Sequence, residues 1–129
     1  MEKPVSGFNF FNLIFGYGKV HGTDKNDLII GSFGKDKISA GDGDDLVFGL
    51  FGDDEISGGL GNDVIFGGFG DDTIIGNKGD DVMLGGRGQD TLVWNNGDGS
   101  DFIDGGKGYD VQQVNFDTDL VNDDLQNDD

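Results

Sequence analysis

The sequence predicts a solenoid, a fold in which one short structural unit repeats along an axis and each unit packs on the next. Three observations support this prediction. A nine-residue pattern recurs without a gap over residues 22–93. The 129 residues include 26 glycines but one proline, a composition suited to many tight turns with positive φ. Hydrophobic residues still make up 34% of the chain, enough to fold if its excess acids are neutralised.

The eight nine-residue units share an acid and an aliphatic residue at fixed places. In order they read GTDKNDLII, GSFGKDKIS, AGDGDDLVF, GLFGDDEIS, GGLGNDVIF, GGFGDDTII, GNKGDDVML and GGRGQDTLV. Glycine holds the first place in seven units and the fourth place in seven. The sixth place is always aspartate, and the eighth is always aliphatic or methionine: Ile29, Ile38, Val47, Ile56, Ile65, Ile74, Met83 and Leu92.

The repeat becomes irregular after Val93. Residues 94–104, WNNGDGSDFID, form an eleven-residue variant with Asp101 in the acid place. Residues 105–113, GGKGYDVQQ, return to nine with Asp110, but a glutamine stands where the aliphatic residue belongs. We therefore expect residues 94–113 to close the solenoid, with Trp94 at the end of its core.

The charge of the chain limits its partners and calls for a cation. The formal net charge is −18, from 26 acids and 8 bases, which disfavours nucleic acids and anionic membranes as partners. Zinc or copper would require histidine or cysteine ligands, and the chain has one histidine and no cysteine. Calcium, by contrast, prefers carboxylate and carbonyl oxygens. The alternative that each aspartate only makes hydrogen bonds within its own turn does not account for so large a charge.

The pattern G-G-x-G-x-D-x-U-x, in which U is aliphatic, resembles the RTX nonapeptide, the hemolysin-type calcium-binding repeat. The resemblance implies an all-β fold, a right-handed parallel β-roll. In such a roll two nonapeptides, 18 residues, make one turn, with a six-residue loop and a short strand in each unit. The strands stack into two sheets, and the eighth-place side chains point between these sheets to form the core.

The resemblance also implies several Ca²⁺ ions, which lie between the loops of successive turns. The implied side-chain ligands are Asp27, Asp36, Asp45, Asp54, Asp63, Asp72, Asp81, Asp90, Asp101 and Asp110. The implied backbone carbonyl ligands lie in the loops near Gly41, Gly43, Gly49, Gly52, Gly58, Gly61, Gly67, Gly70, Gly76, Gly79, Gly85 and Gly88. The outermost sites match the pattern least, because Lys25 replaces a fourth-place glycine and the eleven-residue unit breaks the spacing.

A comparison at a period of eighteen residues separates the outer faces of the two sheets. One outer face is predicted to be apolar, and this face is available for dimerisation or docking: Leu28/Ile30, Leu46/Phe48, Val64/Phe66 and Val82/Leu84. The other face begins with polar residues and becomes apolar toward the C-terminus. The third-place aromatics Phe33, Phe51 and Phe69 are expected to stack about 4.8 Å apart as a packing ladder.

The chain divides into three predicted regions. Residues 1–21 form an N-terminal cap with degenerate strands at Leu13–Phe15 and Lys19–His21. Phe8, Phe10 and Phe11 would close the open end or cover the apolar face. Residues 22–113 form the roll, and residues 114–129 form an acidic tail, either a type I secretion signal or a linker. Neither a membrane span nor a cleaved signal peptide is expected.

These features predict a calcium-binding module that folds outside the cell. In RTX proteins of Gram-negative bacteria, this behaviour implies export through the type I secretion apparatus and stabilisation of a secreted parent protein. The alternative is an adhesion or self-assembly module that uses the apolar face. An enzyme is not expected, because His21 and Arg87 stand apart in the repeat and no serine or cysteine nucleophile is evident.

Overall fold

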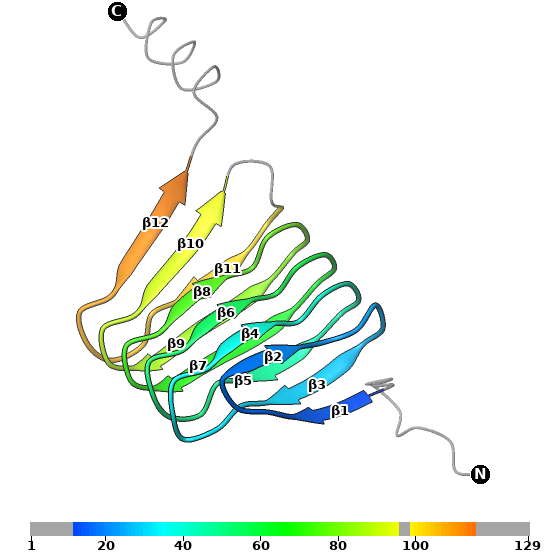
Figure 1. The fold of residues 1–129 in the computed structure, drawn as a ribbon. Coiled ribbons are helices and arrows are strands. Elements are labelled where there is room, and N and C mark those ends of the chain that lie inside the picture. Colours follow the sequence, from blue (N-terminus) through cyan, green and yellow to red (C-terminus); the bar gives the residue numbers. More distant parts are fainter. Residues whose placement is uncertain (1–11, 96–98, 116–129) are drawn as a thin grey trace, which may run out of the picture.

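The computed structural model describes residues 12–95 and 99–115, which form two stacked parallel sheets of six strands each (Figure 1). The chain crosses from one sheet to the other after every strand, so that two strands and two loops make one turn. No helix occurs in the described ranges. The predicted fold class, an all-β solenoid with two parallel sheets and 18 residues per turn, is confirmed.

The strands alternate between the two sheets in chain order. The odd sheet contains β1 (Asn12–Phe15), β3 (Asp27–Ile30), β5 (Leu46–Phe48), β7 (Val64–Phe69), β9 (Val82–Arg87) and β11 (Phe102–Asp104). The even sheet contains β2 (Lys19–His21), β4 (Lys37–Ser39), β6 (Glu55–Ser57), β8 (Thr73–Ile75), β10 (Thr91–Asn95) and β12 (Val111–Asn115). The degenerate strands predicted near the N-terminus are therefore present as β1 and β2. Val114 and Asn115, predicted to begin the tail, instead belong to β12 and pair with Trp94 and Asn95. The predicted roles of Phe8, Phe10 and Phe11, and of residues 116–129 of the tail, fall outside the described ranges.

The strand register shows how the solenoid absorbs its irregular units. In the regular turns each residue pairs with the residue eighteen positions later, as Ile29 does with Val47. The eleven-residue unit changes this offset to twenty, so that Val82 pairs with Phe102. The loop before β11 keeps six residues, 96–101, and β10 is two residues longer than β8 because it includes Trp94 and Asn95. Parallel pairing thus tolerates a longer unit at this point.

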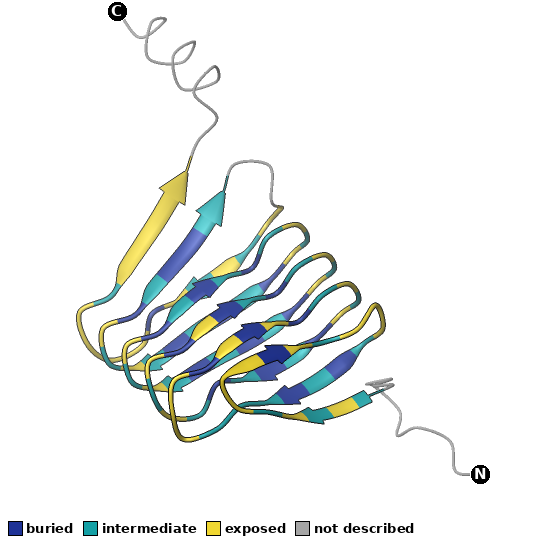
Figure 2. Cartoon of the chain, viewed as in Figure 1, coloured by how far each residue is buried: buried dark blue, intermediate teal, exposed yellow. Residues whose placement is uncertain are grey.

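A single file of eighth-place side chains forms the core between the sheets. Figure 2 shows buried residues, in dark blue, on the strands of both sheets. All eight are at most 2% exposed, as predicted, and Val20 and Ala40 join the same cluster. Ile14 and Ile103 pack against the ends of this cluster and are partly buried. Because the core holds one aliphatic side chain per unit, the sheets lie close together and bring the loops into register.

The aromatic residues stack along the solenoid axis at the spacing of the strands. Phe51 and Phe69 stack with ring centroids 4.9 Å apart, and Phe33 meets Phe51 edge-on at the same distance. The predicted spacing is confirmed, and Phe51 and Phe69 stack as expected, whereas Phe33 is turned edge-on to Phe51. Phe48 and Phe66, on the outer face of the odd sheet, are also stacked at 4.9 Å. The apolar residues predicted on that face are half-buried, so their neighbours along the sheet cover part of each side chain.

Candidate metal centre

The six-residue loops form two rows, one along each edge of the sheets (Figure 1). One row connects the even sheet to the odd sheet and includes residues 22–27, 40–45, 58–63 and 76–81. The other row includes residues 31–36, 49–54, 67–72 and 85–90. Each loop ends in a sixth-place aspartate, and all eight of these aspartates are at most 2% exposed. Asp101 and Asp110, in the irregular units, are half-buried. Buried carboxylates at this density require compensating partners.

One oxygen of each carboxylate is held by the backbone of the preceding turn. The amide of Asp45 donates to Oδ1 of Asp63 over 2.8 Å, and the amide of Asp63 donates to Oδ1 of Asp81 over 2.8 Å. The opposite row repeats this arrangement, for example from the amide of Asp54 to Oδ1 of Asp72. The bonds reach Asp101 and Asp110 at 2.9 Å. These ladders give successive carboxylates the same orientation.

The second carboxylate oxygen has no hydrogen-bond partner in the middle of the solenoid. This holds for Oδ2 of Asp45, Asp54, Asp63, Asp72 and Asp90, all of which are buried. A buried oxygen without a donor costs about 1–3 kcal/mol, and more when it is charged. The two rows of loops therefore present regularly spaced oxygens that need a proton or a cation.

A backbone carbonyl of the next turn faces the same space as this free oxygen. A Cβ placed on Gly58 would lie 2.5 Å from Oδ2 of Asp63 and 2.9 Å from the carbonyl oxygen of Gly76. A Cβ placed on Gly49 would likewise lie 2.6 Å from both Oδ2 of Asp54 and the carbonyl oxygen of Gly67. The first-place glycine thus keeps open a cradle lined by a carboxylate and a carbonyl. Hard oxygen donors of these two kinds fit Ca²⁺.

The remaining glycines shape the loops around these cradles. Gly61, in the fourth place, has a φ of 102°, and a side chain there would collide with the carbonyl of Gly43 in the preceding turn. The second place also has positive φ from Gly41 onward, even where Leu50 (80°) and Asn77 (70°) replace glycine. The carbonyl of Gly41 accepts the amide of Leu60 over 3.1 Å, so second-place carbonyls also join successive loops.

Burial shifts the acidity of the carboxylates in the ion-free solenoid. Loss of hydration raises the pKa of Asp63 to about 9, and repulsion from Asp45, Asp81 and Asp44 adds to this rise. The hydrogen bond from the amide of Asp45 lowers the pKa but does not offset the burial. Desolvation also raises the pKa of Asp45, Asp54 and Asp72 to about 7 and raises that of Asp90. Without a cation, these carboxyls therefore hold protons more tightly than free aspartates do.

Asp27 and Asp36, the first two predicted ligands, have a different environment. Oδ2 of Asp27 accepts the amide of Thr23 over 2.6 Å, and Oδ2 of Asp36 accepts the amide of Ser32 over 2.7 Å. The hydroxyl groups of Thr23 and Ser32 also donate to these carboxylates. The loops of the first turn therefore differ from those that follow.

A second ladder at the fifth place of the repeat was missed by the sequence analysis. The amide of Asn62 donates to Oδ1 of Asp44 over 2.8 Å, and the amide of Asp80 donates to Oδ1 of Asn62 over 2.9 Å. The same bonds join Asp53 to Asp71 and Asp71 to Gln89. These bonds run in the opposite direction to those of the sixth place. The signal was present in the sequence, because Asn or Asp fills the fifth place in six of the eight units.

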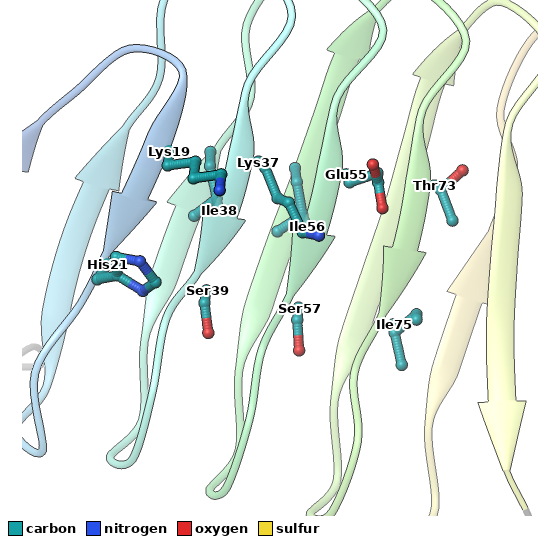
Figure 3. Close-up of a pocket in the computed structure, with 10 residues that line it drawn as sticks. All are labelled: Lys19, His21, Lys37, Ile38, Ser39, Glu55, Ile56, Ser57, Thr73 and Ile75. Carbon is teal, nitrogen blue, oxygen red and sulfur yellow. The ribbon is translucent and has the colours of Figure 1, made fainter.

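The only histidine lies beside a pocket of about 410 Å³ on the outer face of the even sheet (Figure 3). His21 and Ser39 are register partners on β2 and β4. A nucleophile and its base would be joined by a hydrogen bond, and the bonds of the described residues include none between these two side chains. Ser57, farther along the pocket, accepts a bond from the amide group of Asn77 over 2.7 Å.

Among the described residues, no three His, Cys, Asp or Glu side chains form a group that could hold a metal ion. Within the same ranges, no helix has the length and hydropathy needed to cross a membrane.

The comparison with protein families agrees with the geometry of the loops. The family model described as RTX calcium-binding nonapeptide repeat (4 copies) matches residues 21–56, 57–92 and 97–111. Neither the curated proteins nor the solved structures contain a match. Because the matched segments cover more than half of the chain and coincide with the two rows of loops, the chain belongs to the family of RTX calcium-binding nonapeptide repeats.

Proposed function

We propose that the chain binds several Ca²⁺ ions in its two rows of loops and that these ions drive its folding. The observation that carries the proposal is the buried, unpartnered Oδ2 of Asp54, Asp63, Asp72 and Asp90, each of which faces the space beside a first-place glycine together with a glycine carbonyl of the next turn. A bound Ca²⁺ supplies two positive charges and accepts six to eight oxygen ligands. The family to which the chain belongs supports this choice of ion.

The side chains in the middle of the solenoid are the strongest candidates for ion ligands. Asp54, Asp63, Asp72 and Asp90 present the free oxygen beside a first-place glycine, and Asp81, Asp101 and Asp110 continue the two rows. Oδ2 of Asp45 is also unpartnered, but Ala40 occupies the first place of its unit. The carbonyls of Gly67, Gly76 and Gly85 would complete the cradles. In each case the preceding amide holds Oδ1, which leaves Oδ2 oriented for the ion.

The ion-free chain is expected to be expanded. Two unit charges about 5 Å apart repel by roughly 1 kcal/mol in water and by several times as much at a lower effective dielectric constant. Two rows of such pairs oppose a core with one aliphatic side chain per unit. Each filled site adds about 2.7 kcal/mol of stability when calcium is a hundred times its dissociation constant. Because neighbouring sites share loops, we expect cooperative filling.

The biological consequence would be folding outside the cell. Free calcium is scarce in the cytosol and abundant outside, so a calcium-dependent chain stays unfolded until it has been exported. RTX repeats occur in secreted proteins of Gram-negative bacteria, which supports a secreted or cell-surface location here. In this proposal the chain passes through the type I secretion apparatus, folds on release and stabilises its parent protein. Its role is binding and not catalysis.

A second candidate function is adhesion or self-assembly through the outer face of the odd sheet. The stacked rings of Phe48 and Phe66 and the exposed side chains of Leu13, Phe15 and Phe102 favour it. Measurement of the molar mass in solution, with and without calcium, separates the candidates. A monomer in both conditions contradicts self-assembly, and a calcium-dependent dimer supports it.

The calcium proposal is tested by far-UV circular dichroism during a calcium titration, with magnesium as the control. We expect a sigmoidal change from coil to β-structure with calcium and no equivalent change with magnesium, since Mg²⁺ demands a stricter geometry and loses water reluctantly. A chain that is already folded in chelator at neutral pH would contradict calcium-driven folding.

A further inference from the structure

The first two loops differ from all the later regular loops at the second place of the repeat. Thr23 and Ser32 occupy this place in the first turn. The later loops have glycine, leucine or asparagine there, each with positive φ: Gly41, Leu50, Gly59, Gly68, Asn77 and Gly86. Thr23 and Ser32 are not among the residues with positive φ. The loops that differ in backbone conformation also differ in the hydrogen bonds to the sixth-place carboxylate.

Hydrogen bonds occupy both oxygens of the carboxylate in the first loop. Oδ2 of Asp27 accepts the amide of Thr23 over 2.6 Å and its hydroxyl over 3.1 Å. Oδ1 of Asp27 accepts the side-chain amide of Asn12 over 2.8 Å and lies 2.9 Å from the same hydroxyl. A carboxylate offers about four acceptor positions, so these contacts leave little capacity for an ion.

The second loop repeats this arrangement with different donors. Oδ2 of Asp36 accepts the amide of Ser32 over 2.7 Å and lies 2.9 Å from its hydroxyl. Oδ1 accepts the amide of Gly18 over 2.7 Å. Oδ2 of Asp36 therefore has hydrogen-bond donors, whereas Oδ2 of Asp54 and Asp72 in the same row has none.

The cradle itself is nevertheless present at Asp36. A Cβ on Gly31 would lie 2.8 Å from Oδ2 of Asp36 and 2.9 Å from the carbonyl oxygen of Gly49, much as at the later sites. Gly34 also keeps the fourth place of the repeat. The second-place serine is therefore the feature that distinguishes this cradle from the next one in its row.

Basic residues are concentrated at the same end of the solenoid. Four of the eight Lys and Arg residues of the chain lie between residues 19 and 37: Lys19, Lys25, Lys35 and Lys37. The remaining four are spread over the rest of the sequence. Fixed positive charge is thus available near the two acids whose oxygens are already occupied, which reduces the need for an ion there.

We propose that Thr23 and Ser32 take the place of calcium in the first turn, so that Asp27 and Asp36 bind no ion and the calcium sites lie in the later turns, where Oδ2 has no donor. This inference rests on the proposed calcium-binding function. It makes the first turn a calcium-independent cap, whose amide and hydroxyl donors do what the ion does in later turns. Thr23 and Ser32 are therefore residues that determine site occupancy.

The test is the number of ions bound at saturating calcium, measured by native mass spectrometry on variants shown to be folded by circular dichroism. Asp27→Asn and Asp36→Asn are expected to leave the number unchanged, whereas Asp63→Asn is expected to lower it by at least one. A loss of ions in Asp27→Asn or Asp36→Asn equal to that in Asp63→Asn overturns this inference alone. A wild-type chain that takes up no calcium overturns the proposed function as well.

A gain-of-site variant tests the same inference without removing a carboxylate. Ser32→Gly should release Oδ2 of Asp36, let the loop adopt positive φ and add one bound ion. Ser39→Gly, at an exposed strand position in the same unit, is the matched control and should leave the number of ions unchanged. An unchanged ion count in folded Ser32→Gly would show that Ser32 does not determine occupancy.

Discussion

At the scale of single residues, the two oxygens of each sixth-place aspartate have separate roles. Oδ1 accepts the amide of the preceding turn and sets the orientation of the side chain, whereas Oδ2 is left for a cation in the middle of the solenoid. The carboxylate is thus both a structural acceptor and a candidate ligand. The effect of a substitution depends on which of these roles it removes.

Replacement of Asp63 by alanine removes both roles. We expect Asp63→Ala to raise the calcium concentration at the folding midpoint and to reduce stability by about 2–3 kcal/mol at saturating calcium, the scale of one lost site. Asp42→Ala is the control, because Asp42 is exposed in a neighbouring loop and its removal changes the net charge equally. The two variants are compared by calcium titration with circular dichroism. Equal midpoints would mean that only the total charge matters.

Glycine in the first place can be tested in the same way. Gly58→Ala would put a methyl group 2.5 Å from Oδ2 of Asp63, into the space assigned to the ion. We expect weaker calcium binding by isothermal titration calorimetry. In Gly34→Ala the new methyl group would lie 3.9 Å from the hydroxyl oxygen of Ser32, an ordinary van der Waals distance, so we expect near wild-type affinity. Comparable losses of affinity in both variants would contradict the cradle.

The raised pKa values predict how acid affects the ion-free chain. The folded-state pKa is about 7 for Asp45, Asp54 and Asp72, above the ordinary value near 3.9. Protonated carboxyls therefore favour the ion-free fold fully below about pH 4, and this contribution is lost as the pH rises toward 7. In chelator we expect more β-structure at pH 4 than at pH 7. Circular dichroism at both values, with calcium at pH 7 as the reference, checks this; a pH-independent coil would contradict it.

At the scale of the structural elements, each strand is short and depends on the turns beside it. Most strands have only three or four residues and contribute one fully buried side chain. No strand of this size is stable alone, so its stability comes from parallel pairing and from the continuous core. Defects in one element should therefore spread to its neighbours along the axis.

Truncation of a central core residue should show this dependence. Ile65 on β7 is fully buried between the sheets, and Ile65→Ala is expected to cost about 2–5 kcal/mol. Urea unfolding at saturating calcium measures the loss, and Ser39→Ala at an exposed strand position is the control. A loss below about 1 kcal/mol for Ile65→Ala would show that the ions, and not the core, dominate stability.

The elements also show where prediction from the sequence succeeded and why. The period of nine predicted the row of buried side chains that forms the core. The period of eighteen assigned neighbouring units to different sheets. Both depend on side-chain direction, which a repeat encodes directly. The eleven-residue unit was recognised as irregular, but the extension of β10 by Trp94 and Asn95 became visible only in the strand pairing.

At the scale of the whole molecule, the solenoid combines a neutral interior with two highly charged edges. The sequence analysis named ten carboxylates and set apart only the outermost sites, because a sequence shows the residue type but not the hydrogen bonds of each oxygen. The difference at Asp27 and Asp36 depends on the backbone conformation of Thr23 and Ser32. The hypothesis that the aspartates only make hydrogen bonds within their own turn holds for Oδ2 of Asp27 and Asp36, but Oδ1 of these residues accepts hydrogen bonds from Asn12 and Gly18 outside the loop.

The one-way direction of the sixth-place ladders has a consequence for symmetry. Every amide donates toward the C-terminal neighbour, so the stack is polar and its ends are not interchangeable. Two copies could extend these ladders only head to tail. Such an arrangement grows into an open filament unless the rotation between copies closes a ring. At the N-terminal end, Asn12 and Gly18 already fill the acceptor positions that an incoming copy would use. The first turn thereby blocks filament growth at that end of the molecule.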